Sequence, residues 1–123
     1  MSTDELEVGG RFLEALGTAR EIGDHEPLYP FLAPDIEGEM PQLVLPGIDE
    51  VRDGLTWVKP PESLDFEFRR GDLQDLGKGR MIVDVHETYR VAATEEFAYA
   101  RERRIQLTVR ERQIVRYEMR VVG

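Results

Sequence analysis

Three charged residues in the second half of the chain share the sequence parity of an apolar stripe, and they could do chemistry there. Glu87 lies two residues after Val85, while Arg101 and Arg103 lie four and two residues before Ile105. A carboxylate held among apolar side chains can act as a general acid or base, with a nearby arginine as its partner. We therefore expect Glu87 to be the catalytic residue if the protein is an enzyme. The alternative is that the three charges simply pair at the mouth of a pocket, where the strands extend past the helices.

Alternation of apolar and polar residues predicts the strands that carry these charges. The pattern has a period of two over about 81–91, 97–110 and 115–121, and a further strand is expected over 64–69. A period of two places one parity on each face of a sheet. The opposite parity carries Asp84, His86 and Arg104, so His86 is expected on the outer face and not in the pocket.

Apolar residues at helical spacing dominate the first half of the chain. We expect a helix from Ser2 that ends near Gly23, a short helix over 26–33 that Pro30 interrupts, and a helix over about 48–58. A short strand is expected to open at Asp35, and 71–79 is expected to be a turn region.

Helices at the start and a meander of strands at the end predict an α+β fold. We expect a single domain over residues 1–123, with the N-terminal helices packed on a strongly curved antiparallel sheet. A strongly twisted sheet can curl around helices laid across its concave face, which encloses a pocket.

Composition excludes several function classes. The chain has 123 residues and a formal net charge of −9, with 16 basic against 25 acidic residues. Non-specific binding to nucleic acid or to an anionic membrane surface needs concentrated basic residues, so neither partner is expected. There is no cysteine and there are only two histidines, so we expect no disulfide, no metal site and no cofactor. No apolar run is long enough to span a bilayer, and the N-terminus lacks the features of a signal peptide, which predicts a cytoplasmic protein.

Four phrases along the chain resemble the NTF2-like superfamily, in particular its SnoaL-like members. They are RFLEAL at 11–16, FLAPDI at 31–36, GIDEV at 47–51 and QIVRYE at 113–118. The resemblance implies a cone-shaped α+β barrel with an apolar pocket, commonly a homodimer through the outer face of the sheet. It implies no single activity, because the superfamily includes ketosteroid isomerases, polyketide cyclases, epoxide hydrolases, dehydratases and non-catalytic binders.

The catalytic positions that this resemblance implies carry the wrong chemistry in this chain. The general base of the ketosteroid isomerases falls on Met40, their oxyanion tyrosine on Phe12 and their oxyanion carboxylic acid on or near Ile105. The final-strand aspartate of the epoxide hydrolases falls on Met119. The known catalytic sets are therefore missing.

The sequence leaves two functions open. The first is a pocket protein that binds a small, largely apolar molecule without the known catalytic sets. The second is a small isomerase, cyclase or dehydratase that uses Glu87 as acid/base with a tyrosine or arginine partner. The residues expected to contact a ligand are Phe12, Met40, Trp57, Tyr89, Tyr99, Arg101, Arg103, Tyr117 and Met119.

Both signs of charge alternate on the outer parity of the last strands, for example at Asp84, Arg104, Arg116 and Glu118. A two-fold related copy of the same face could pair these charges reciprocally. We therefore expect a homodimer through the outer face of the sheet.

Overall fold

The structure of the protein is a computed structural model that describes residues 3–56 and 61–122. The helices are α1 (Thr3–Ile22), the 3₁₀ helix η1 (Glu26–Phe31) and α2 (Ile48–Leu55). The strands are β1 (Leu32–Met40), β2 (Leu43–Leu45), β3 (Leu64–Arg70), β4 (Gln74–Gly77), β5 (Arg80–Val91), β6 (Phe97–Arg110) and β7 (Gln113–Val121). The α+β fold class expected from the sequence is confirmed.

The strands form one sheet in the order β2-β1-β7-β6-β5-β3. Strand β4 lies off this path and pairs with the start of β5, whereas β3 pairs with the rest of β5. The pairs are antiparallel except β1 with β7, which is parallel. The expectation of a wholly antiparallel sheet is therefore wrong for this one pair. The direction of β1 is set by its pairing with β7, the last strand of the chain. No local sequence pattern in β1 could have predicted that direction.

Three local expectations also need correction. Strand β1 begins at Leu32, within the expected second helix and ahead of Asp35. Strand β2 was not expected, and β4 lies inside the expected turn region. Helix α2 ends at Leu55, and residues 57–58 of the expected helix lie outside the described residues. Strands β2 and β4 are only three and four residues long, so alternation has too few positions to reveal them.

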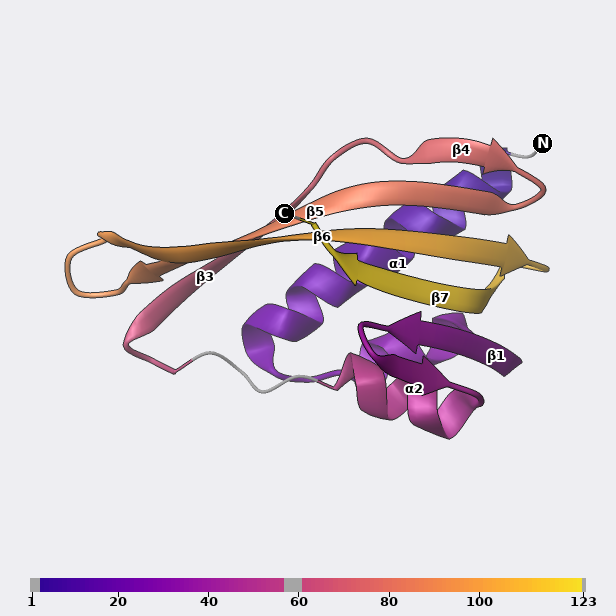
Figure 1. Cartoon of the computed structure of the whole chain (residues 1–123), viewed down its shortest axis with the longest axis horizontal. Helices are drawn as coiled ribbons and strands as arrows, with labels where there is room; N and C mark the ends of the chain where they lie inside the picture. Colours follow the sequence, from indigo (N-terminus) through magenta and orange to yellow (C-terminus); the bar gives the residue numbers. More distant parts are fainter. Residues whose placement is uncertain (1–2, 57–60, 123) are drawn as a thin grey trace.

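Helix α1 lies across one face of the sheet, here called the inner face (Figure 1). Two glycines let the helix approach closely: a Cβ on Gly9 would collide with the Met81 side chain, and one on Gly17 would lie 2.7 Å from the Phe68 ring. Between helix and sheet lies one hydrophobic core. Its largest fully buried apolar side chains are Tyr117, Phe12, Leu13, Leu16, Leu28, Ile36, Leu55, Met81, Ile105, Leu107 and Ile114.

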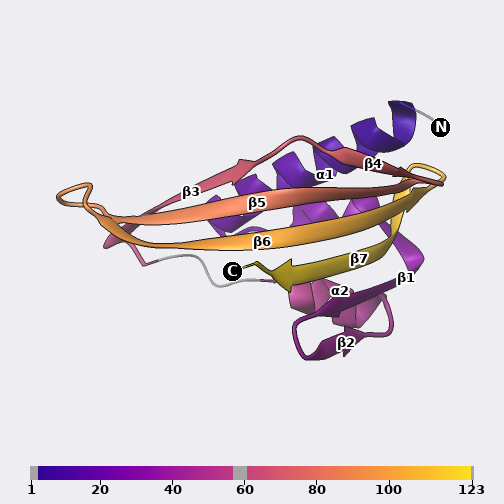
Figure 2. The ribbon, with the colours of Figure 1, turned by 45° about the horizontal axis from the view of Figure 1, so that its top comes forward.

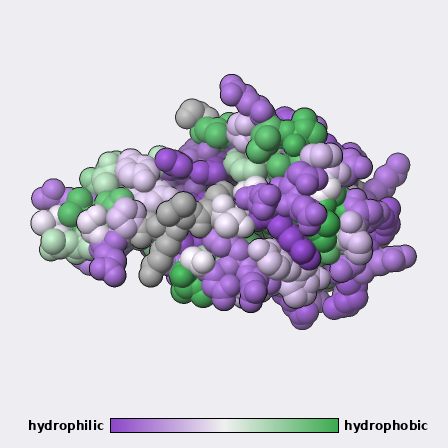
Figure 3. Space-filling model, turned by 90° about the horizontal axis from the view of Figure 1, so that it is seen from below, coloured by the Kyte–Doolittle hydropathy of each residue, from purple (hydrophilic) through white to green (hydrophobic). Residues whose placement is uncertain are grey.

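The sheet is strongly bent, and the far ends of β3, β5 and β6 project beyond α1 (Figure 2). A register shift between Tyr89 and Arg90 marks a bulge in the β5–β6 pair there. The projecting end carries the exposed side chains of Phe97 and Tyr99. Figure 3 shows hydrophobic patches mixed with hydrophilic ones on this end, and further hydrophobic patches on the body of the molecule.

None of the helices among residues 3–56 and 61–122 is both long enough and apolar enough to span a bilayer.

Candidate functional site

The C-terminal turn of α1 brings a cation to the inner face of the sheet. Arg20 lies four residues after Leu16, on the face of the helix that packs into the core. Strands β5 and β6 supply Glu87 and Arg103 on the same side of the sheet, because their parity matches that of the buried residues Val85 and Ile105. We call Arg20, Glu87 and Arg103 the ionic cluster.

Both carboxylate oxygens of Glu87 are held by guanidinium groups. Arg20 Nη1 lies 2.9 Å from Glu87 Oε2, and Arg103 Nε lies 2.9 Å from Glu87 Oε1. The side chains are 6%, 1% and 13% exposed for Arg20, Glu87 and Arg103, so the pairs are shielded from water. Ion pairs in such surroundings are screened little by solvent, so they hold the three groups together.

Two tyrosine hydroxyls lie beside the ionic cluster. Arg20 Nη2 donates a hydrogen bond of 3.1 Å to the Tyr89 hydroxyl. The Tyr117 hydroxyl is buried and has no hydrogen-bond partner among the described residues. Burial raises the pKa of both hydroxyls, and the neighbouring guanidinium groups only partly offset this effect. Both phenols are therefore neutral at physiological pH and keep their hydroxyl proton, which can be donated in a hydrogen bond.

Aromatic rings surround the ionic cluster on the projecting end of the sheet. The Tyr89 ring stacks on Tyr99 at a centroid distance of 4.4 Å and packs against Phe66 at 5.1 Å. The Arg20 guanidinium carbon lies 5.3 Å from the centre of the Phe66 ring. Tyr99 is 40% exposed, so it forms the rim where this inner surface meets solvent.

A hollow of about 500 Å³ opens beside the cluster, where β7 ends and β6 continues. Arg101, Arg103 and Val121 line it from the inner parity of their strands. The remaining lining residues are His86, Ala100, Glu102 and Val122. We call this space the strand-end hollow; Arg103 belongs to both it and the ionic cluster.

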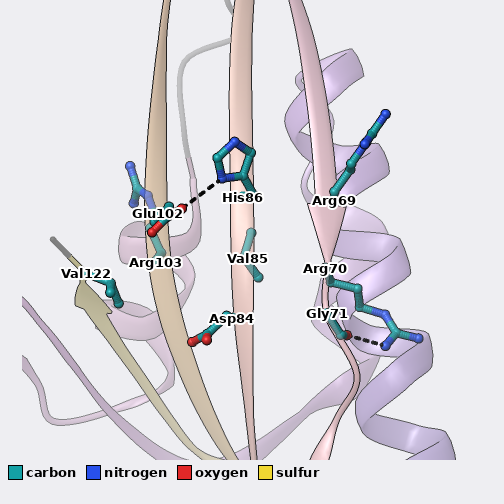
Figure 4. Close-up of a pocket in the computed structure, with 9 residues that line it drawn as sticks. All are labelled: Arg69, Arg70, Gly71, Asp84, Val85, His86, Glu102, Arg103 and Val122. Atoms are coloured by element: carbon teal, nitrogen blue, oxygen red, sulfur yellow. Dashed lines mark hydrogen bonds and ion pairs between the residues drawn. The ribbon is translucent and has the colours of Figure 1, made fainter.

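A second hollow of about 310 Å³ overlaps the first around Glu102, Arg103 and Val122 and extends along the outer face to β3 (Figure 4). In it, His86 Nδ1 lies 3.4 Å from Glu102 Oε1, and both side chains are about half exposed. The expectation that His86 lies on the outer face agrees with this position. Among the described residues, no serine, threonine or tyrosine lines the hollow, so none of them offers the His86–Glu102 pair a hydroxyl nucleophile there.

The structure separates the two arginines that were expected to accompany Glu87. Arg103 contacts it, whereas the Arg101 guanidinium lies over the exposed Tyr99 ring, 5.5 Å from its centre. Arg101 is therefore an entrance residue of the strand-end hollow and not a partner of Glu87.

The other residues expected at a ligand site lie mostly in the core. Phe12 packs edge-to-face on Phe31 and Tyr117, and Met40 packs against the core from β1. Met119 is buried, and its sulfur accepts a contact of 3.8 Å from Arg103 Nη1. Trp57 lies outside the described residues.

The sequence interpretation missed Arg20. The available signal was its position one helical turn after Leu16 and two turns after Phe12, both on the apolar face of α1. A polar residue on such a face indicates a buried partner across the core.

Among the described residues, no group of three or more histidine, aspartate or glutamate side chains is placed to hold a metal ion.

No family model matches this sequence, and no protein with a curated description matches it. Solved structures do match its fold. An NTF2-like protein from Anabaena variabilis ATCC 29413 aligns over 100% of this chain and 93% of its own, with a TM-score of 0.73 and 14% identity. An LEH-like epoxide hydrolase of M. tuberculosis aligns over 98% of this chain and 84% of its own, with a TM-score of 0.65 and 13% identity.

A de novo designed protein with a curved β-sheet also aligns over the whole chain and 89% of its own, with a TM-score of 0.63 and 20% identity. Identities this low show the fold alone. Any activity has to be argued from the side chains of this chain.

Proposed function

We propose that this chain, which has the NTF2-like fold, binds a small, largely apolar molecule in the strand-end hollow beside the ionic cluster. The observation that carries the proposal is the hollow itself: about 500 Å³, with the apolar side chains of Ala100, Val121 and Val122 beside the polar ones of His86, Arg101, Glu102 and Arg103. Ligand sites in proteins commonly combine these features in spaces of about 300–1,000 Å³.

The geometry of Glu87 favours binding over acid/base chemistry. Each of its oxygens is held by a guanidinium group at 2.9 Å in a buried site, so both oxygens are already engaged in ion pairs. Glu87 therefore acts as an anchor that holds Arg20 and Arg103 in fixed positions. A rigid polar frame of this kind orients a ligand.

The second candidate function is an enzyme of isomerase, cyclase or dehydratase type that uses Glu87 as acid/base. Its support is the burial of the Glu87 carboxylate beside a tyrosine hydroxyl, since Arg20 contacts both Glu87 and Tyr89. The similar M. tuberculosis structure is named an epoxide hydrolase, which shows that this fold can host a reaction.

A thermal-shift screen with steroids, aromatic polyketides and terpenoids tests the binding proposal, because a ligand of the folded state raises its apparent stability. Val121→Asp should abolish the shift, since Val121 lines the hollow and is 66% exposed. Val44→Asp is the matched control, because Val44 is 69% exposed on β2, outside the strand-end hollow. Equal loss of binding in both variants would count against the proposed location.

The variant Glu87→Gln distinguishes the two functions. Compounds that bind are first assayed for turnover by the unchanged protein, and the same assay is then run on the variant. A catalytic Glu87 predicts that the variant loses turnover by a factor of about 10² or more. Glu7→Gln, on the exposed surface of α1 and outside the strand-end hollow, is the control for loss of a carboxylate. Unchanged turnover in Glu87→Gln would exclude the acid/base role.

We also propose that a second copy of the chain packs on the outer face of the sheet. Its support is the alternation of charge on this face, where Arg104 pairs with Asp84 at 2.8 Å and Arg116 lies near Glu37, Glu39 and Glu118. A face with both signs can complement itself across a two-fold axis.

A further inference from the structure

We propose that the groove between α1 and β3 docks an extended, basic segment of a partner protein, which adds a strand to the free edge of β3. The described residues that line this groove are different from those that line the strand-end hollow. The docking surface is therefore independent of the proposed function.

The first observation is the free edge of β3. This strand ends the sheet path and pairs only with β5 among the described residues (Figure 2). The Gly71 N–H donates a hydrogen bond to the Asp84 carbonyl oxygen in the same antiparallel register. Because backbone groups alternate in direction along an antiparallel strand, those of Phe68 and Arg70 point away from β5. A free edge of this kind accepts an added strand.

The second observation is the groove beside this edge, which has a volume of about 290 Å³. Leu13 and the Phe68 ring form its apolar part, and Gly17 lets the helix approach that ring closely. Residues directly opposite one another in a sheet have side chains on the same face. Every second side chain of an added strand would therefore face α1 and this apolar surface.

The third observation is the charge of the helix wall. Glu14 and Glu21 line the groove and are exposed, and neither forms an ion pair with another described residue. The β3 wall carries one cation, Arg70, whose Nη1 donates a hydrogen bond to the Gly71 carbonyl oxygen. The described lining therefore has a net charge of −1, with its negative charges on the helix. Basic side chains of an added strand complement these charges.

Geometry sets the pattern of such a segment. Seven residues of helix separate Glu14 from Glu21, a rise of about 10 Å. Positions i and i+4 of a strand face the same side about 13 Å apart, and flexible lysine side chains cover the difference. The groove therefore fits a lysine, an apolar residue and a second lysine at alternate positions. A second copy of the chain on this edge would instead bring its own Glu14 and Glu21, and like charges repel.

The test uses synthetic peptides. The probe is acetyl-Thr-Lys-Thr-Leu-Thr-Lys-Thr-amide, and its match has glutamate in place of both lysines. Both are titrated into ¹⁵N-labelled protein and followed by NMR at constant ionic strength. We expect the lysine peptide to bind tenfold or more tightly than the glutamate peptide and to shift the amide signals of Phe66, Phe68 and Arg70. Absence of binding, equal affinities, or shifts only at other residues would overturn the proposal.

N-methylated peptides test the addition of a strand. The backbone groups at the free edge belong to residues whose side chains face α1, so the peptide residues that bond to them face α1 as well. Methylation of the leucine nitrogen should therefore weaken binding tenfold or more. Methylation of the threonine nitrogen just before it, which points away from β3, should leave binding intact. Equal effects of the two methyl groups would overturn the proposed strand pairing.

Charge-reversal variants locate the basic residues. Glu14→Lys and Glu21→Lys should each reduce the preference for the lysine peptide severalfold, and the double variant should reverse it. Asp53→Lys, exposed on α2 outside the groove, makes the same change of charge and should leave the preference intact. All three positions are exposed, so the variants should fold. A preference for the lysine peptide that survives in the double variant would overturn the proposal.

Hydrogen exchange distinguishes a partner segment from a second copy of the chain. In the free protein the Phe68 and Arg70 amides should exchange at rates that do not depend on protein concentration, and the lysine peptide should slow them. Protection that rises with protein concentration, in the absence of peptide, would show that a second copy occupies the edge and would overturn the proposal.

Discussion

At the scale of single residues, the buried hydroxyl of Tyr117 departs most clearly from the usual rules of protein interiors. The ring packs edge-to-face on Phe12 and lies in the core, yet the hydroxyl forms no hydrogen bond with any described residue. Leaving such a group unpaired costs about 1–3 kcal/mol of folding free energy.

Tyr117→Phe should therefore increase the free energy of unfolding of the ligand-free protein by about 1 kcal/mol. Tyr89→Phe is the matched control, because the Tyr89 hydroxyl accepts a hydrogen bond from Arg20 and its loss should decrease stability. Urea denaturation of the two variants and the unchanged protein measures both effects. A loss of stability in Tyr117→Phe comparable to that in Tyr89→Phe would show that the Tyr117 hydroxyl is satisfied in solution.

A second residue-scale prediction concerns His25, which is buried at the start of η1. Burial lowers the pKa of His25 below its usual value of 6.5, Arg20 adds to this effect and Asp24 partly opposes it. The unfolded chain then binds a proton that the folded chain excludes. Stability should be complete above pH 6.5 and should fall as the pH drops from there through the folded pKa.

Thermal unfolding at pH 7.5 and at pH 5.5 measures this dependence. His25→Gln should unfold at more similar temperatures at the two pH values than the unchanged protein does, because glutamine does not titrate. If both proteins lost the same number of degrees, carboxylates and not His25 would be responsible for the pH dependence.

At the scale of elements, the parallel pairing of β1 with β7 depends on a close backbone approach. Gly38 lies opposite Tyr117 in this pair, and a Cβ on Gly38 would lie 2.7 Å from the Tyr117 carbonyl oxygen. A backbone oxygen held in a sheet cannot move aside as the end of a flexible side chain can. Glycine at this position therefore allows β1 to close the sheet against the last strand.

Gly38→Ala should decrease the free energy of unfolding by about 1–3 kcal/mol, the usual cost of an overpacked contact. The matched control is Gly10→Ala in α1, where the new methyl group would lie 3.6 Å from Arg70 Nη2, an ordinary contact. Since alanine favours a helix over glycine, the control should be neutral or stabilising by up to about 1 kcal/mol. Comparable urea midpoints for the two variants would contradict the role given to Gly38.

At the scale of the whole molecule, the two faces of the sheet differ in burial and in the kind of ion pair that they carry. The inner face packs on α1 and holds the ionic cluster, whereas the outer face carries exposed pairs such as Asp84–Arg104. Each exposed pair contributes little to the stability of one chain. We therefore expect the exposed charges to affect the binding of another protein surface to the outer face more than they affect the stability of the single chain.

We expect a homodimer by light scattering at about 10 μM, in the range of ordinary subunit affinities. Arg104→Glu should shift the population toward monomer, because it replaces one sign of charge in the proposed self-complementary face. Arg11→Glu makes the same change of charge on α1 and should remain dimeric. A clean monomer for the unchanged protein would contradict the proposed use of this face.

The sequence by itself determined the strands of the second half and the faces of their residues. Alternation is a local property of an extended chain, so Glu87 and Arg103 could be assigned to the inner face, and His86 to the outer face, without knowledge of any partner. The α+β class follows from the same local periods.

Only the tertiary structure decided which of these groups meet. The pairing of Arg20 with Glu87 depends on where α1 crosses the sheet, and the direction of β1 depends on a partner strand some eighty residues away in the chain. The surroundings of the Tyr117 hydroxyl, which has no hydrogen-bond partner within 3–56 and 61–122, are likewise set by segments that are distant in the chain. Local pattern fixes the face on which a side chain lies, but contacts between distant segments fix the charge and hydrogen bonding of the site.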